Sequence, residues 1–147
     1  MSEYDINNLP LVDMGIHTEK ELEGKLAACL LLYPKETLDL CNGLKFRVNK
    51  EAKRLWEKAQ EIRNQVVDSD DEYTLIANLL SDLQIPLIDQ YKWIGLILKE
   101  DLFTDQPINP ADRIIKTMSD LEAMRGTVIW LDYVQKNHLL DSFFRGA

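Results

Sequence analysis

The sequence predicts an all-α protein, a compact multi-helix bundle of about six helices with a long C-terminal helix. Three observations support this fold class. Apolar residues recur at intervals of three and four along most of the chain, which is the spacing of one helical face. Helix start and stop signals, such as Asn109-Pro110 and Pro34, separate these segments. Only one short segment favours a strand, and the sequence offers no second strand to pair with it.

The first predicted helix spans residues 18–34. Thr18 and Glu21 have the spacing of a capping box, in which each side chain bonds the backbone N–H of the other residue. The second half of the segment is apolar almost all round, so we expect neighbours on several sides. Pro34 ends the helix, because the residue before a proline is pushed out of the α region. The apolar residues at helical spacing in this first helix are Leu22, Leu26, Cys29, Leu30 and Tyr33.

Residues 1–17 have no sustained apolar period, and we expect them to form an extended N-terminal arm. Residues 18–147 are then a single helical domain, with the long helix at about 110–137. A chain of this length can bury a substantial core without disulfides or metals.

Two helices are expected after Pro34. The first spans residues 35–41 and ends at Asn42-Gly43, where a left-handed C-terminal residue is expected. Phe46 is predicted to anchor the loop that follows. Asn49 then caps a longer helix that reaches about Val67. The apolar face of this longer helix contains Ala52, Leu55, Trp56, Ala59, Ile62 and Val66.

Residues 68–72, Asp-Ser-Asp-Asp-Glu, are predicted to be a loop and a helix start. Acidic residues there favour the positive end of the next helix. A calcium loop is not predicted, because its glycine and its later bidentate glutamate are absent. Residues 73–83 form the next helix, with Ile76, Leu79, Leu80 and Leu83 inward. Pro86 begins another, which carries Leu87, Ile88, Tyr91, Ile94 and Leu98 at helical spacing.

Asn109-Pro110 is a strong start signal for the last helix, with asparagine as N-cap and proline at the first helical position. From there a helix can run to about Asn137. Gly126 is expected to kink or split this helix. A helical hairpin at the C-terminal end of the chain is the other possibility. Residues 128–134 contain Val, Ile, Trp and Tyr, so a strand is the competing local structure.

After Gly126, the apolar residues of this last helix lie all around its circumference. Burial of one face against the core would require fewer of them. A second contact surface, on another part of the chain or on a partner, would explain them. We therefore predict a protein interface formed by Met124, Val128, Ile129, Trp130, Tyr133 and Val134.

The net charge of −8 argues against a domain that holds nucleic acid by neutralising phosphates. Cys29 and Cys41 lie among apolar residues and are expected to be reduced, buried thiols rather than a disulfide. The acidic N-terminus does not resemble a signal peptide, and no apolar run is long enough to span a bilayer. We expect a cytoplasmic protein without membrane contact.

The sequence carries no recognisable catalytic constellation. It has neither a phosphate-binding loop nor a dinucleotide-binding glycine motif. His17 and His138 lack partners at metal-ligand spacing, and the serines lie in ordinary helix and turn contexts. Two pairs of acids, Glu21 with Glu23 and Asp120 with Glu122, are expected to be exposed helical carboxylates. We predict a non-enzymatic protein without cofactor or metal, and keep a small helical enzyme as the least favoured alternative.

Several segments, in order, resemble the N-terminal domain of bacterial hexameric replicative helicases of the DnaB type. Glu23, the apolar run to Leu32 and Pro34 are similar to the first helix of that domain, although Ala28 stands where the family usually has glycine. Residues 36–39 resemble its short second helix. The remaining similar residues are Phe46, Arg54, Leu55, Trp56, Thr74, Leu75, Ala77 and Leu80, and then residues 107–115. The histidine-arginine pair of the third helix and the motor domain are both missing.

This resemblance implies a protein–protein interaction module of DNA replication, in which the family's domain forms a collar by self-association. The implied partners are a second copy in a homodimer or higher homo-oligomer, and a replicative helicase, primase or helicase loader. The helicase-binding domain of primase has a similar helical fold, and a free-standing phage or mobile-element relative is another possibility. An acidic regulator or inhibitor that binds a basic protein surface is the alternative function.

Overall fold

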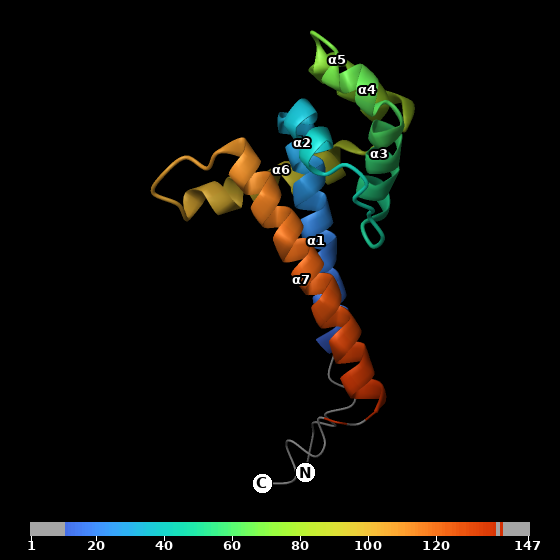
Figure 1. Cartoon of the computed structure of the whole chain (residues 1–147), viewed down its shortest axis with the longest axis vertical. Coiled ribbons are helices and arrows are strands. Elements are labelled where there is room, and N and C mark those ends of the chain that lie inside the picture. Colours follow the sequence, from blue (N-terminus) through green and yellow to red (C-terminus); the bar gives the residue numbers. More distant parts are fainter. Residues whose placement is uncertain (1–10, 138, 140–147) are drawn as a thin grey trace.

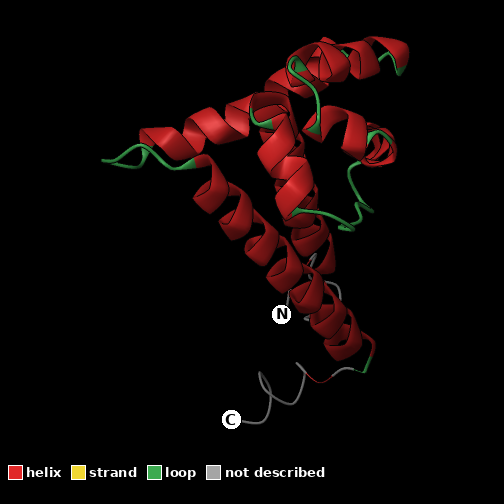
Figure 2. Ribbon diagram, turned by 45° about the horizontal axis from the view of Figure 1, so that its top comes forward, coloured by secondary structure: helices red, strands yellow, loops and turns green. Residues whose placement is uncertain are grey.

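The computed structural model describes residues 11–137 and 139, and within them it contains seven α-helices and no strand (Figures 1 and 2). The predicted all-α class is therefore confirmed. The helices are α1 (Leu11–Leu32), α2 (Pro34–Leu40), α3 (Lys50–Glu61), α4 (Arg63–Val67), α5 (Glu72–Asp82), α6 (Leu87–Leu102) and α7 (Pro110–Lys136).

The two long helices α1 and α7 lie side by side and run antiparallel, and their lower halves project from the rest of the molecule as a stalk (Figure 1). Helices α2, α3 and α6 pack against α1, while α4 packs on α2, and α5 packs on α2 and α3. In Figure 1 these helices lie at the upper end of the molecule, above the stalk, and we call this part the head. The central position predicted for the first helix is confirmed. Five successive residues of α1, 26–30, are completely buried, and α1 packs on α2, α3, α6 and α7.

The helix boundaries follow the local signals closely. The Asn49 side chain accepts from the Ala52 N–H at 3.2 Å, and that of Asn109 accepts from the Ala111 N–H at 2.9 Å. Gly43 has φ +83°, the left-handed conformation expected after the second helix. Phe46 is buried and stacks on Trp56, with ring centroids 4.4 Å apart. These predictions are confirmed.

The extended arm is wrong for residues 11–17, which are helical and belong to α1. Residues 1–10 of the predicted arm lie outside the described residues. The capping box is also wrong, because the Thr18 hydroxyl donates to the Met14 carbonyl within the helix and Glu21 pairs with His17. The first turns of α1 pack against α7, so a contact distant in sequence outweighs the local start signal.

The helix predicted from Asn49 to Val67 is interrupted at Ile62, which separates α3 from α4. After the break, Arg63 Nε donates to the Leu38 carbonyl at 3.2 Å and its Nη2 pairs with Asp39 at 3.0 Å. The turn therefore directs an arginine to the C-terminal end of α2, where unpaired carbonyls need donors.

The long helix α7 is confirmed, at 27 residues. It continues through Gly126 without a break, so the expected split and the competing strand at residues 128–134 are both wrong. Its antiparallel partner among the described residues is α1, from the other end of the chain (Figure 2). A second arm of a hairpin after Asn137 would lie, apart from residue 139, outside the described residues. None of the described helices is long and apolar enough to cross a membrane.

Candidate protein-contact surface

The stalk is held together by close packing at a glycine. A Cβ atom on Gly15 would lie 2.8 Å from Val128 Cγ2, which is closer than real contacts allow. Met124 and Leu131 are the next nearest neighbours of that position. Gly15 thus allows α1 and the distal half of α7 to approach closely.

This packing corrects half of the predicted interface. Val128 and Val134 are only 7% and 3% exposed, and Met124 is half-buried beside Gly15. These three side chains are used within the chain and are not an open surface. The sequence indicated excess apolar residues here, but it did not show that α1 covers part of them.

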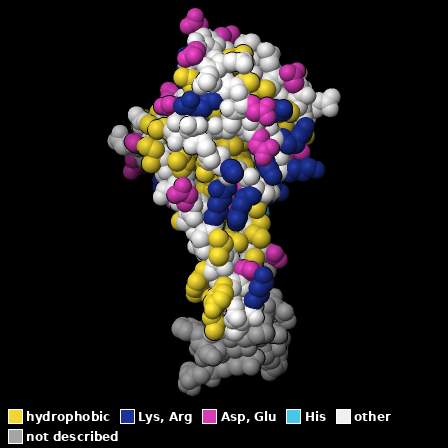
Figure 3. Space-filling view, turned by 45° about the vertical axis from the view of Figure 1, so that its right-hand side comes forward, with side chains coloured by type: hydrophobic (Ala, Val, Ile, Leu, Met, Phe, Trp, Pro, Cys, Tyr) yellow, Lys and Arg dark blue, Asp and Glu magenta, His cyan; other side chains and the backbone are white. Residues whose placement is uncertain are grey.

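The other three predicted residues are exposed and lie on the outer side of α7. Ile129, Trp130 and Tyr133 are 64%, 57% and 59% exposed. Tyr133 lies three residues after Trp130 and four after Ile129, so its side chain is next to both on one side of the helix. We call these three residues the α7 patch. Figure 3 shows apolar side chains on the narrow part of the molecule, below the head.

Two buried carboxylates fix the head to the stalk. Glu19 and Glu23 on α1 are completely buried. Arg47 binds Glu19 through two hydrogen bonds of 2.6 and 2.8 Å, and Arg125 of α7 bridges both carboxylates at 3.1 and 3.0 Å. Glu23 also accepts from the backbone N–H groups of residues 47, 48 and 49. Loop 41–49, α1 and α7 therefore meet at one charged cluster.

Burial alone would raise the pKa of the Glu19 carboxyl, but hydrogen bonds and charges from Arg47 and Arg125 outweigh it and lower the pKa. This cluster was not predicted, and the expectation that Glu23 is an exposed helical carboxylate is wrong. A signal was present, because Glu19 and Glu23 continue the helical spacing of the buried Leu26 and Leu30.

A second charged cluster joins α1, α6 and α7. Arg113 is 3% exposed and pairs with Glu100 at 2.7 Å and with Asp101. Lys25 also pairs with Glu100. Burial, together with the positive charges of Lys116 and Arg113, lowers the pKa of Lys25. This cluster fixes the position of α6 relative to the stalk.

The cysteines are set up for packing rather than for nucleophilic chemistry. Both are free and buried, as predicted. Burial raises the pKa of the Cys29 thiol to about 11 and that of Cys41 to about 12. Both are therefore protonated at neutral pH, whereas a reactive cysteine is a thiolate. The Cys41 thiol lies 3.0 Å from the sulfur of Met118.

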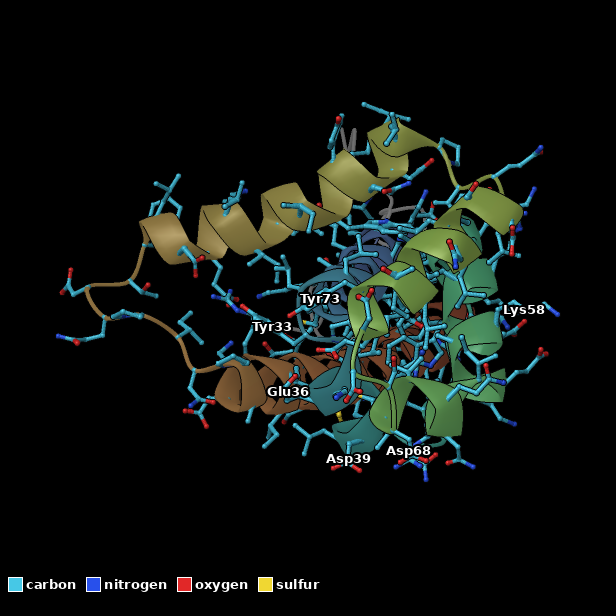
Figure 4. The ribbon with its side chains drawn as sticks, turned by 90° about the horizontal axis from the view of Figure 1, so that it is seen from above. Tyr33, Glu36, Asp39, Lys58, Asp68 and Tyr73 are labelled. Atoms are coloured by element: carbon cyan, nitrogen blue, oxygen red, sulfur yellow. The ribbon has the colours of Figure 1, made fainter. Side chains whose placement is uncertain are left out.

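The acidic segment 68–72 serves local structure. The Asp71 carboxylate caps α5 by accepting hydrogen bonds from the backbone N–H and the hydroxyl of Thr74. These hydrogen bonds lower the pKa of Asp71. Glu72 forms an ion pair with Lys35 at 3.4 Å. Viewed from above, the labelled Glu36, Asp39 and Asp68 lie on one side of the head (Figure 4). Within the described residues, no group of three or more His, Cys, Asp or Glu is arranged to hold a metal.

No protein-family model matches this chain, and no curated protein or solved structure shows significant similarity to it. The resemblance to the helicase N-terminal domain stays a prediction from motif order. The features that bear on function are thus the exposed surfaces and the rigid framework beneath them.

Proposed function

We propose that this protein is a non-catalytic protein–protein interaction module that self-associates through the α7 patch. The exposure of Ile129, Trp130 and Tyr133 is the single observation that carries this proposal. Tryptophan and tyrosine are enriched at the centres of protein interfaces, where they supply most of the binding energy. A contiguous apolar group on one helical face is also unusual on a surface that only water contacts.

The framework of the stalk supports the same proposal. The buried faces of α1 and α7 are joined by close packing at Gly15 and by the Arg125 bridges, so the outer face is held in place before a partner arrives. Little ordering is then needed on binding, which favours affinity.

We further propose that the module acts in DNA replication, where it would contact a replicative helicase, a primase or a helicase loader in the cytoplasm. The order of similar motifs along the chain supports this part of the proposal. Purified replicative helicase, primase and helicase loader from the source organism are the probes, immobilised and tested with the intact chain. Absence of binding to all three at 50 μM would refute this part and leave self-association standing.

Trp130→Glu tests the self-association. We expect the wild-type chain to form a dimer or higher oligomer at tens of micromolar in sedimentation velocity, and Trp130→Glu to shift it to monomer, because a charge replaces the central apolar contact. Ile115→Glu is the matched control, since Ile115 is 52% exposed on the proximal half of the same helix. A monomeric wild-type chain at 100 μM, or equal effects of the two substitutions, would contradict the proposal.

The alternative function is an acidic regulator that binds a basic protein surface, which the net charge of −8 supports. Binding of this kind weakens steeply with salt, because exposed charges are screened. Binding to a replication protein that is unchanged between 50 and 500 mM NaCl would favour the replication module over this alternative.

A further inference from the structure

The outer face of α6 carries a second apolar surface. Trp93 and Ile97 attach this helix to the core and are 3% and 2% exposed. The opposite face carries four apolar side chains between 59% and 82% exposed, with a glycine between them. We call this face the α6 stripe: it consists of Ile88, Tyr91, Gly95, Leu98 and Leu102.

The spacing within the α6 stripe matches the seam of a helix pair. Its residues follow one another at intervals of three, four, three and four, which is the repeat of the core positions in a coiled coil. The stripe extends for about 21 Å along the helix axis. A Cβ added to Gly95 would meet no atom within 4 Å, so a partner backbone can approach closely there. In Figure 4, α6 lies along one edge of the bundle with side chains projecting away from it.

The charges beside the stripe indicate the nature of the partner. Lys92 and Lys99 occupy the flanking positions on the side of α6 that carries Leu96. Neither has an ion pair within the described part of the chain. Two grooves of about 370 and 600 Å³, which share Glu21 and Leu96, lie along this same side. Among their charged residues, those without an ion pair in the described part of the chain are Lys20, Lys92 and Lys99 on the basic side and Asp89 and Asp112 on the acidic side. In a chain of net charge −8, two unpaired lysines along one apolar seam favour a partner with acidic residues at that edge.

A second copy of α6 fits this edge poorly. Antiparallel pairing centred on Gly95 would match the apolar residues of the two copies. It would also place Lys92 of one copy beside Lys99 of the other on the same edge, and like charges there oppose association.

We propose that the α6 stripe docks an amphipathic helix of another protein, whose apolar seam is flanked by glutamate or aspartate. This contact is separate from the α7 patch and does not depend on self-association. Docking of this kind uses the apolar seam for affinity and the lysine edge for orientation.

Two synthetic peptides of 21 residues test the proposal. Both carry leucine and isoleucine at the seam positions, with glutamate at the flanking positions of one and lysine at those of the other. Fluorescence anisotropy of the labelled peptides would report binding to the intact chain. We expect the acidic peptide to bind at least tenfold more tightly than the basic one. The negative net charge of the protein alone would favour the basic peptide, so this result would report the local charge beside the α6 stripe.

Three variants sharpen the test. Leu98→Asp should weaken the acidic peptide at least tenfold, and Lys92→Glu/Lys99→Glu should reverse the preference between the peptides. Lys45→Glu/Lys50→Glu changes the net charge equally at exposed lysines outside α6 and should leave both affinities within about twofold. Circular dichroism would confirm that each variant is folded.

The opposite outcomes are equally clear. No binding of the acidic peptide at 100 μM, tighter binding of the basic peptide, or equal effects of the two lysine pairs would overturn the proposal. A change of oligomeric state in Leu98→Asp without any peptide binding would assign the stripe to a second copy instead.

Discussion

At the scale of single residues, the buried carboxylates of α1 have the largest structural role. The Glu23 carboxylate accepts hydrogen bonds from three backbone N–H groups of one loop and from the guanidinium of Arg125 on α7. A carboxylate in such a place satisfies donors that would otherwise be buried without acceptors. Glu23 therefore holds the loop that precedes α3, although it lies on a different helix.

Replacing Glu23 with alanine should destabilise the fold strongly. We expect a loss of about 3 kcal/mol or more in the free energy of unfolding, because three backbone N–H groups lose their acceptor and Arg125 loses one of its two carboxylates. Urea denaturation followed by circular dichroism measures it. Glu122→Ala, at an exposed position of α7, should change stability by no more than about 0.5 kcal/mol. Similar losses of stability in both variants would mean that the Glu23 cluster contributes no more to the free energy of unfolding than an exposed carboxylate does.

Glu19 makes the stability depend on pH. Its carboxyl has a pKa below the ordinary 4.5 in the folded chain, so the unfolded state takes up the proton first as the pH falls. The stabilisation is complete above the unfolded value and is lost as the pH falls through the folded one. We expect thermal unfolding midpoints to fall below pH 4.5 more steeply in wild type than in Glu19→Gln. Parallel profiles for the two proteins would refute this assignment.

At the scale of helices, local signals and long-range contacts contributed unequally. The start of α7 and the cap of α3 were predicted correctly, because Asn109-Pro110 and Asn49 act through bonds within one turn. The Thr18–Glu21 pattern misled because residues 11–17 gain their helical structure from packing on α7. No local pattern reports a neighbour more than a hundred residues away.

Helix α6 shows a second limit of the sequence. The apolar residues Ile88, Tyr91 and Leu98 have helical spacing, but the residues that attach the helix to the core are Trp93 and Ile97. A helix with apolar residues on most sides has no single face that the sequence can identify as buried. The candidate surface on α7 was half predicted for the same reason, since the position of α1 decided which side stayed exposed.

The packing of α1 against α7 can be tested at Gly15. Gly15→Ala should lower the free energy of unfolding by about 1–3 kcal/mol despite the better helix propensity of alanine, because its Cβ would meet the Val128 methyl group. In Gly15→Ala/Val128→Ala the combined loss should be smaller than the sum of the single losses. Additive losses in urea denaturation would show that the two positions do not contact each other.

At the scale of the whole molecule, the head and the stalk present two apolar surfaces of different kinds. The α7 patch is a compact aromatic group near the end of the stalk, and the α6 stripe is a linear seam beside lysines. The cluster formed by Lys25, Glu100 and Arg113 connects α6 and α7, the helices that carry these two surfaces. A module that uses both surfaces can hold a second copy and another protein at the same time.

The antiparallel arrangement of α1 and α7 places Leu11 and Lys136 at the same end of the molecule (Figure 1). A pulling force applied at these two positions would act across the helix pair and not along it. The contacts would then open one turn after another, beginning beside Gly15, instead of sharing the load. The stalk should therefore unzip at low force, and the charged cluster at Glu19, Glu23 and Arg125 is the first strong mechanical barrier that the opening would meet.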